Sequence, residues 1–170
     1  MTRADFDLEA LYRAIDEQRR ARGLTWAAAA REINRGGTGR RPIAVSSITG
    51  LATKAVAEGD GVLQMLRWLD RTPESFVPGI EDANGARFRL SDPGPTRLLR
   101  WDVPAIHTAL DAERQARGVT WQSVAAQIGG VTPAMLTNLA KASRIGFPGV
   151  MRIMQWLNCP AATFTRVSDW

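Results

Sequence analysis

Apolar side chains recur along this chain at the three- and four-residue spacing that is typical of amphipathic helices. Residues that favour helix starts and ends separate these stripes: Thr120 and Thr132-Pro133 are typical caps, and Gly118 is a typical terminator. No segment alternates convincingly between apolar and polar residues, so we expect no strands. The pattern predicts helices near residues 7–22, 25–34, 45–54, 61–71 and 73–76, and an equivalent series of five after residue 102.

Two copies of one pattern account for these predicted helices. A shift of 95 residues places residues 11–33 on a segment of the second half with 10 of 23 positions identical. A shift of 88 residues likewise aligns residues 43–77 with a later segment of the second half. The shift changes where the first copy has NRGGTGRRP and the second has only Gly129-Gly130. The chain therefore contains one small helical unit twice.

The segment between the copies has no counterpart in either of them. It contains Pro93-Gly94-Pro95, a composition that is typical of a linker. We therefore expect two small domains, copy one at residues 1–78 and copy two at residues 102–170, joined by a linker at residues 79–101. Each copy has its own apolar set for a core: Ile15, Ile33, Ile48, Leu51, Leu66, Leu69 and Phe76 in copy one, and Leu110, Ile128, Leu136, Leu139, Ile153, Leu157 and Phe164 in copy two.

Composition narrows the class of protein. The chain is 45% hydrophobic and 23% charged, as soluble globular proteins are, and it has no apolar run long enough for a membrane helix. The acidic N-terminal segment is unlike a signal peptide, so we expect a cytoplasmic location. The single Cys159 and the single His107 exclude an internal disulfide and a Cys/His zinc set. Because no catalytic spacing of residues is found either, we expect neither an enzyme nor a cofactor or metal.

The charge balance favours a polyanionic partner. The chain has 22 basic and 17 acidic residues, a formal net charge of +5 and a sequence pI near 10.6. The densest basic cluster is Arg35–Arg41, whose glycines would let the backbone follow DNA phosphates or a narrow minor groove. A solvated loop with no DNA contact is the alternative for this cluster.

A shared frame of residues suggests which kind of domain each copy is. The frame consists of Thr120, Val124-Ala125, Gly129, Val131-Thr132, Leu136 and Leu139 in copy two, and of Thr25, Ala29-Ala30, Ile33, Ile43, Ile48 and Leu51 in copy one. The later segments GVLQMLRWLDRTPESF and PGVMRIMQWLNCPAATF match a fourth and a fifth helix. With this frame, each copy resembles the helix-turn-helix domain of the phage-repressor and Cro type, the lambda-repressor-like family.

The resemblance implies a fold and a function. The fold would be all-α, with two small five-helix bundles in tandem related by a pseudo-two-fold axis. The function would be sequence-specific binding of double-stranded DNA by a transcriptional regulator, and we expect a repressor. Helix three of each copy (residues 45–54 and 132–141) would enter the major groove. The two fused domains would imitate the usual dimer, either in a monomer or in a further homodimer.

The candidate DNA contacts are mostly small or basic. Asn138 is the one helix-three residue with a forked amide, which can pair with adenine N6 and N7. Lys54, Lys141 and Arg144 follow helix three, where they suit phosphates or complement the helix dipole. The full candidate set is Thr25, Arg35, Arg40, Arg41, Ser46, Ser47, Thr49, Lys54, Thr120, Gln122, Thr132, Ala134, Thr137, Asn138, Lys141 and Arg144.

Several features have alternative interpretations. Trp26 and Trp121 could stack on a base, but we expect them to pack helix two on helix one. The arginines of helix one, Arg19, Arg22, Arg114 and Arg117, are expected to form a solvated face. The small, weakly charged surface of helix three also suits an anti-activator or antitoxin-like module that binds a protein partner. This protein-interaction module is the alternative function.

Overall fold

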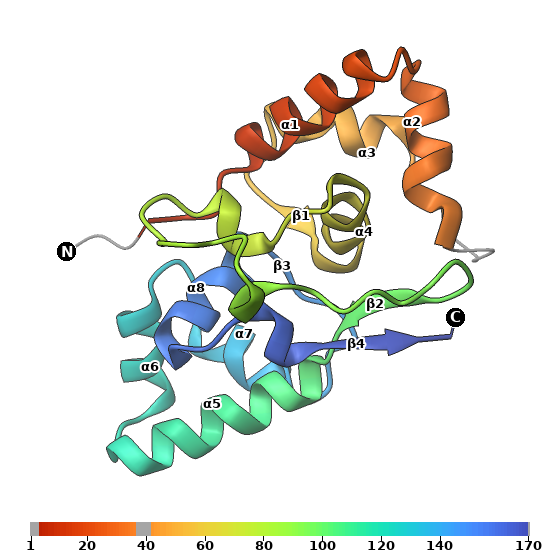
Figure 1. Ribbon diagram of the computed structural model, residues 1–170. Coiled ribbons are helices and arrows are strands. Elements are labelled where there is room, and N and C mark those ends of the chain that lie inside the picture. Colours follow the sequence, from red (N-terminus) through yellow and green to blue (C-terminus); the bar gives the residue numbers. More distant parts are fainter. Residues whose placement is uncertain (1–3, 37–41, 170) are drawn as a thin grey trace.

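The computed structural model describes residues 4–36 and 42–169, and it is mostly helical (Figure 1). The α-helices are α1 (Leu8–Ala21), α2 (Trp26–Ile33), α3 (Val45–Thr49), α4 (Gly59–Leu69), α5 (Val103–Arg117), α6 (Trp121–Ile128), α7 (Pro133–Asn138) and α8 (Gly149–Leu157). Short 3₁₀ helices are η1 (Asn34–Gly36), η2 (Gly50–Ala52), η3 (Pro73–Phe76), η4 (Ala86–Phe88) and η5 (Ala161–Phe164). Within these described ranges, no helix is long and apolar enough to cross a membrane.

The third helices are shorter than predicted. Helix three of copy one was expected to reach residue 54, but α3 ends at Thr49 and η2 continues only to Ala52. In copy two, α7 ends at Asn138, so the predicted Lys141 lies beyond it. Gly50 explains the early change to 3₁₀ geometry in copy one, because glycine weakens a helix interior.

Two small antiparallel sheets correct the expectation that the chain has no strands. β1 (Ala57–Glu58) pairs with β3 (Gly146–Phe147), and β2 (Leu98–Trp101) pairs with β4 (Thr165–Ser168). β1 and β3 are too short for any alternation to be visible in the sequence. β2 is buried at Leu98, Leu99 and Trp101, so it too lacks an alternating pattern, and it lies in the segment predicted as a linker.

The two copies repeat each other in their local hydrogen bonds. Asp7 caps α1 and its N–H donates to the carbonyl oxygen of Phe76 at 2.9 Å. Asp102 caps α5 in the same way, and its N–H donates to Phe164 at 2.7 Å. These pairs are equivalent in the sequence repeat. The repeat therefore extends from residue identity to backbone geometry.

A single connected cluster of buried side chains spans both copies. Phe147 of copy two is fully buried, and its ring lies 4.6 Å from that of Phe6 in copy one and 5.7 Å from that of Trp101. All members of the two predicted apolar sets are buried except Leu157 and Phe164, which are half-buried. In Figure 1, α1–α4 form the upper half and α5–α8 the lower half, with β1 and β3 between them.

Candidate nucleic-acid interface

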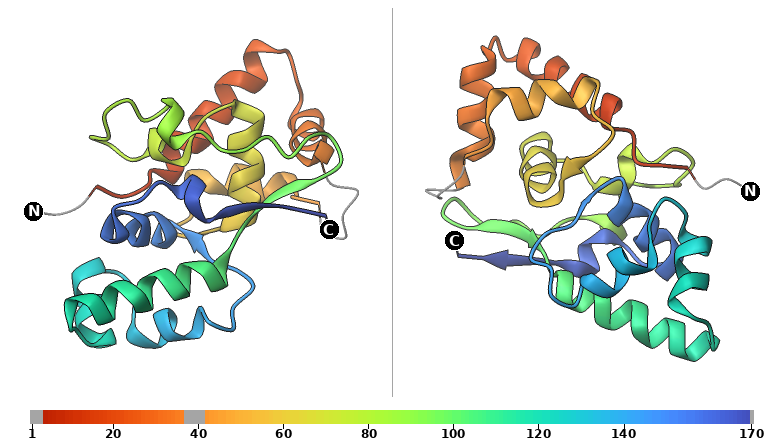
Figure 2. Two further views of the ribbon diagram at one scale, coloured as in Figure 1. Left: turned by 60° about the horizontal axis from the view of Figure 1, so that its bottom comes forward. Right: turned by 180° about the vertical axis from the view of Figure 1, so that it is seen from behind.

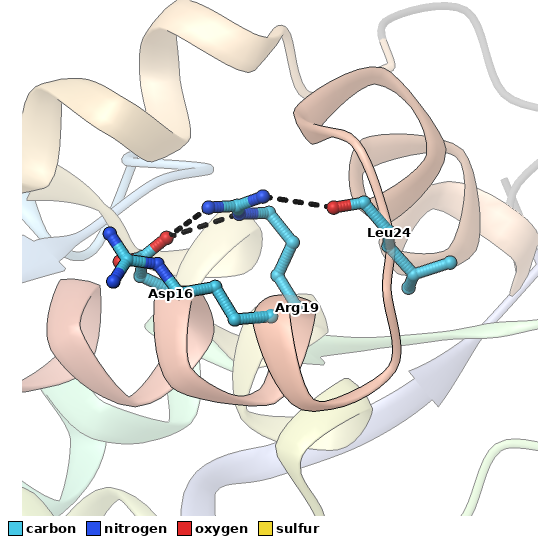
Figure 3. Close-up of polar contacts among 4 residues, drawn as sticks. Asp16, Arg19 and Leu24 are labelled. Atoms are coloured by element: carbon cyan, nitrogen blue, oxygen red, sulfur yellow. Dashed lines mark hydrogen bonds and ion pairs between the residues drawn. The ribbon is translucent and has the colours of Figure 1, made fainter.

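An arginine clamp fixes the turn between the first two helices of each copy. In copy one, the Arg19 guanidinium donates to Oδ1 of Asp16 at 2.6 and 3.1 Å and to the carbonyl oxygen of Leu24 at 2.9 Å (Figure 3). In copy two, Arg114 donates to Asp111 at 2.7 and 3.0 Å and to Val119 at 3.2 Å. The clamp sets the position of helix two.

Tryptophans pack against the same arginines. Trp26 stacks on Tyr12 with a centroid distance of 5.8 Å, and Arg19 lies 4.5 Å above its ring. Trp121 stacks in the same way on His107 at 5.5 Å. The prediction that these tryptophans pack helix two on helix one is confirmed. The prediction of a solvated arginine face is wrong for Arg19 and for Arg114, whose side chains are only 17% and 24% exposed.

A second tryptophan in each copy, in α4 and in α8, joins helix four to helix two. The Trp68 indole N–H donates to Glu32 at 2.9 Å, and Arg22 pairs with the same carboxylate at 2.6 Å. In copy two, the Trp156 indole N–H donates to Gln127 at 3.0 Å. The frameworks are thus equivalent, but copy one uses a carboxylate where copy two uses a neutral amide.

Three of the five predicted threonine contacts serve as helix caps. Thr25, Thr120 and Thr132 accept the N–H of the residue three positions later, each at 3.1 Å, and all three are exposed. These hydroxyl groups hold the starts of α2, α6 and α7. They stay candidates for phosphate contact, because capping uses one lone pair of each oxygen.

The remaining copy-one candidates differ in exposure. Ser46 and Lys54 are exposed, whereas Ser47 and Thr49 are half-buried, and the Thr49 hydroxyl donates to its own helix at 3.2 Å. Arg35 is exposed in η1. The predicted contacts Arg40 and Arg41 lie outside the described residues.

The copy-two candidates are all on the surface. Gln122 is exposed on α6 and Ala134, Thr137 and Asn138 are exposed on α7. Lys141 and Arg144 are exposed in the segment after α7. Seen from behind, α3 and α7 lie on the same side of the molecule, the side turned away in Figure 1 (Figure 2).

A cleft of about 500 Å³ brings predicted residues of both copies together. Ser47 and Lys54 come from copy one and Arg144 comes from copy two. We call this the copy-one cleft, because most of its lining residues belong to copy one. Its other lining residues are Asn34, Pro42, Ile43, Ala44, Leu51, Val56, Ala57, Glu58, Asp60, Gly61, Val62, Gln64, Met65, Leu98, Arg100 and Ser143.

Charged and polar side chains make up about half of the lining of the copy-one cleft. Burial raises the pKa of Asp60, whose carboxylate accepts the Trp101 N–H at 3.0 Å, and the charges of Arg100 and Arg144 oppose this shift. Glu58 caps α4 by accepting N–H groups at 2.7 and 3.2 Å. The two carboxylates are therefore used within the fold.

Copy two contains the equivalent hollow, with the opposite chemistry. It encloses about 360 Å³, and we call it the copy-two groove. It is lined by Ala55, Val56, Gly130, Val131, Met135, Leu136, Leu139, Ile145, Gly146, Phe147, Pro148, Gly149, Arg152 and Ile153. Val56 and Met135 are 65% and 53% exposed, and they are the exposed large hydrophobic residues of the described chain.

Sequence analysis missed Met135 and Val56. Met135 has helical spacing with the core residues of α7, so its sequence pattern is that of a buried residue. Val56 lies in a connection whose position next to copy two depends on the β1–β3 pairing. One signal was present: the repeat equivalent of Met135 is Ser47, which shows that this position does not require an apolar side chain.

Comparison of the chain with protein-family models, with curated proteins and with solved structures found no match. In the described ranges, no three His, Cys, Asp or Glu side chains come together as a metal site. The interpretation of this surface therefore rests on its own geometry and chemistry.

Proposed function

We propose that the protein is a sequence-specific DNA-binding regulator in which two fused helix-turn-helix domains act as a pseudo-dimer. Dimers of this kind present two equivalent helices to successive turns of the major groove. The chain supplies both helices, α3 and α7, from one polypeptide. Because their exposed residues differ, the two half-sites in the DNA would also differ.

The observation that supports this proposal most strongly is the contact between the copies. Glu58 pairs with Gly146, and these two residues are equivalent in the repeat. Ala57 pairs with Phe147, and the repeat equivalents of these two residues are Ile145 and Gly59. Those equivalents are also in contact, because the Gly59 N–H donates to the carbonyl oxygen of Ile145 at 2.8 Å. Such self-complementary contacts are what a two-fold interface requires. They support a pseudo-two-fold relation between two tandem helix-turn-helix units.

Selection of bound duplexes from a random pool tests the proposal. We expect a site with two unlike half-sites, bound with an affinity that falls steeply with salt. Replacement of Arg35, Arg40 and Arg41 by alanine should reduce the salt slope by about 0.9 for each phosphate that the variant no longer neutralises. Equal affinity for all duplexes, with no salt dependence, would contradict DNA binding.

Asn138 gives a sharper test of base recognition. Asn138→Ala should relax the base preference in one half-site only, at a cost of about 1–3 kcal/mol there, because a forked amide reads adenine. The other half-site of the same duplex is the control. A uniform reduction of affinity on every sequence would assign Asn138 to backbone positioning.

The alternative function is a module that binds another protein, and the copy-two groove is the observation that favours it. Exposed apolar side chains often mark protein interfaces. Isolation of one stoichiometric protein partner, unaffected by nuclease, would support this alternative.

A further inference from the structure

The two exposed large hydrophobic side chains of the described chain lie in one place. Val56 belongs to copy one and Met135 to copy two, yet both line the copy-two groove. Exposed apolar surface in a monomeric protein is costly to solvate and commonly marks a binding site. The groove therefore needs an explanation beyond core packing.

The repeat provides an internal control for this explanation. At the equivalent position in the copy-one cleft, Ser47 replaces Met135 and Arg144 replaces Val56. Both hollows are built on the same framework of helices, so the fold accepts polar residues at these positions. The apolar character of the groove is therefore not required for stability, and it fits a role in binding.

The neighbouring residues indicate the chemistry of the occupant. Asn138 follows Met135 by three residues on α7, so the two side chains lie near one face of the helix, and both are exposed. Lys141 and Arg144 are exposed in the segment between Leu139 and Ile145, which both line the groove. Arg152 is the charged residue among the lining positions, and its guanidinium is paired with Asp5 at 2.5–2.6 Å.

These features together match an A·T base pair in a DNA major groove. Thymine carries a methyl group, the apolar group on the floor of the major groove, and adenine presents the N6 and N7 atoms that suit an asparagine. The adjoining basic residues suit phosphates. A protein segment would use the apolar side chains but would leave this arrangement of Asn138 and the basic residues unexplained.

Resting on the proposed function, we infer that Met135 and Val56 form a thymine-methyl contact that makes the half-site of copy two rich in A·T pairs. In the copy-one cleft, Ser47 and Arg144 occupy the two equivalent positions, and Val56 borders that cleft without a second exposed large apolar side chain among the described residues. The copy-one half-site would therefore be read without this paired methyl contact. Val56 would then contribute to base preference in the half-site of the other copy. A helix-turn-helix unit acting alone would not show this dependence.

Replacing thymine by deoxyuridine in the selected duplex removes only the methyl group and tests the inference directly. We expect each contacted methyl in the copy-two half-site to contribute about fourfold to affinity, and substitutions in the copy-one half-site to have no effect. Met135→Ser should abolish the uracil effect, Val56→Ala should reduce it, and Met135→Leu should retain it. The unfolding transition of each variant shows that the fold is intact.

The possible outcomes separate the two proposals. If a specific duplex is bound but uracil is neutral at every position, the methyl contact is overturned while DNA binding stands. If no duplex is selected, the proposed function fails and the methyl contact fails with it. If a protein partner no longer binds Met135→Ser while duplex affinity is unchanged, the groove belongs to that partner and the inference is overturned.

Discussion

Copy one and copy two share a framework but differ in the hollows beside their third helices. The clamps are the same: Arg19 and Arg114 hold equivalent turns with nearly equal hydrogen-bond lengths. The hollows are not: the copy-one cleft contains Lys54 and two carboxylates, whereas the copy-two groove is lined mainly by aliphatic side chains. The duplication has therefore kept the clamp residues and changed many of the residues that line the two hollows.

Equivalent positions of the two copies can be divided into those that are constant and those that vary. A residue that is identical in both copies and packed, such as Trp26, is explained by the fold. A residue that differs between equivalent positions, such as Met135 and Ser47, is free to serve recognition. Each copy also contributes to the hollow of the other at the junction: Arg144 of copy two lines the copy-one cleft, and Val56 of copy one lines the copy-two groove.

The largest expected effect comes from separating the copies. If the chain is cut between residues 85 and 95, we expect the two pieces to stay together as a complex, because Phe6 and Phe147 share one core. A piece that is produced without the other should bind the selected duplex about 10²–10⁴-fold more weakly, because it lacks the second contact that the joined copies make intramolecularly. Size-exclusion chromatography and duplex titration measure both. Full affinity in one piece would contradict the pseudo-dimer.

Gly59 and Gly149 test the junction at a smaller scale. They begin α4 and α8, which are equivalent helices. A Cβ on Gly59 would overlap the backbone oxygen of Ile145 and approach the Trp101 indole, whereas a Cβ on Gly149 would meet no atom within 4 Å. We expect Gly59→Ala to lower the free energy of unfolding by about 1–3 kcal/mol.

Gly149→Ala is the matched control for this substitution. Replacing glycine at an unstrained helical position reduces the entropy of the unfolded chain, so stability should be unchanged or slightly higher. Denaturant unfolding measures both variants. Equal stability of the two would show that the copies do not pack closely at β1 and β3.

The sequence predicted the helical framework well and the junction poorly. Periodicity and capping residues are local signals, so α1, α2 and the caps Thr25 and Thr120 could be predicted from them. The pairing of β1 with β3 involves two residues from each strand, which is too few for a pattern. The prediction that residues 79–101 only connect the copies missed β2, because a short buried strand looks like any apolar run.

The candidate site shows the same division. Ala134, Thr137 and Asn138 of α7 could be named in advance as exposed, because the frame of the repeat indicates which positions face the core, but Met135 was not. The position of Lys54 and Arg144 in one cleft could not be predicted, because it depends on how the two copies dock. The division into two domains stays a prediction that the cut chain will test.

The next largest expected effect on stability comes from Glu74, which also contacts the other copy across the junction. It is buried in η3 of copy one, and its carboxylate accepts the Ala161 N–H of copy two at 2.7 Å. Its second oxygen has no hydrogen-bond partner among the described residues. Burial raises the pKa of Glu74 above its ordinary value, so the folded state binds a proton more readily than the unfolded state. Stability should therefore fall as pH rises from about 4.5 through the raised pKa of Glu74.

Glu74→Gln keeps an acceptor for Ala161 and removes the charge. We expect this variant to be more stable than the wild type near pH 7 and to lack that part of the pH dependence. Glu81→Gln, at an exposed position, removes the same charge without relieving burial and is the control. Urea unfolding between pH 4 and 8 makes the measurement. Identical pH profiles for wild type and Glu74→Gln would mean that the carboxyl is not buried in the folded protein.

The smallest effect concerns a place where the framework itself differs. Hydrogen bonding from the Trp68 indole, aided by Arg22, lowers the pKa of Glu32. Because the folded state favours the ionised carboxylate, this stabilisation is present above the unfolded pKa and is lost as pH falls through the lowered pKa. In copy two, Gln127 accepts the equivalent bond from Trp156 and cannot titrate.

Glu32→Gln should therefore cost little stability at pH 7 and make the acid side of the unfolding profile less steep. Gln127→Glu should make that side steeper. The carboxyl carbon shift of residue 32, followed by NMR from pH 2 to 6, reports the pKa directly. A profile unchanged by both substitutions would show that the carboxylate and the amide are interchangeable at this position of the framework.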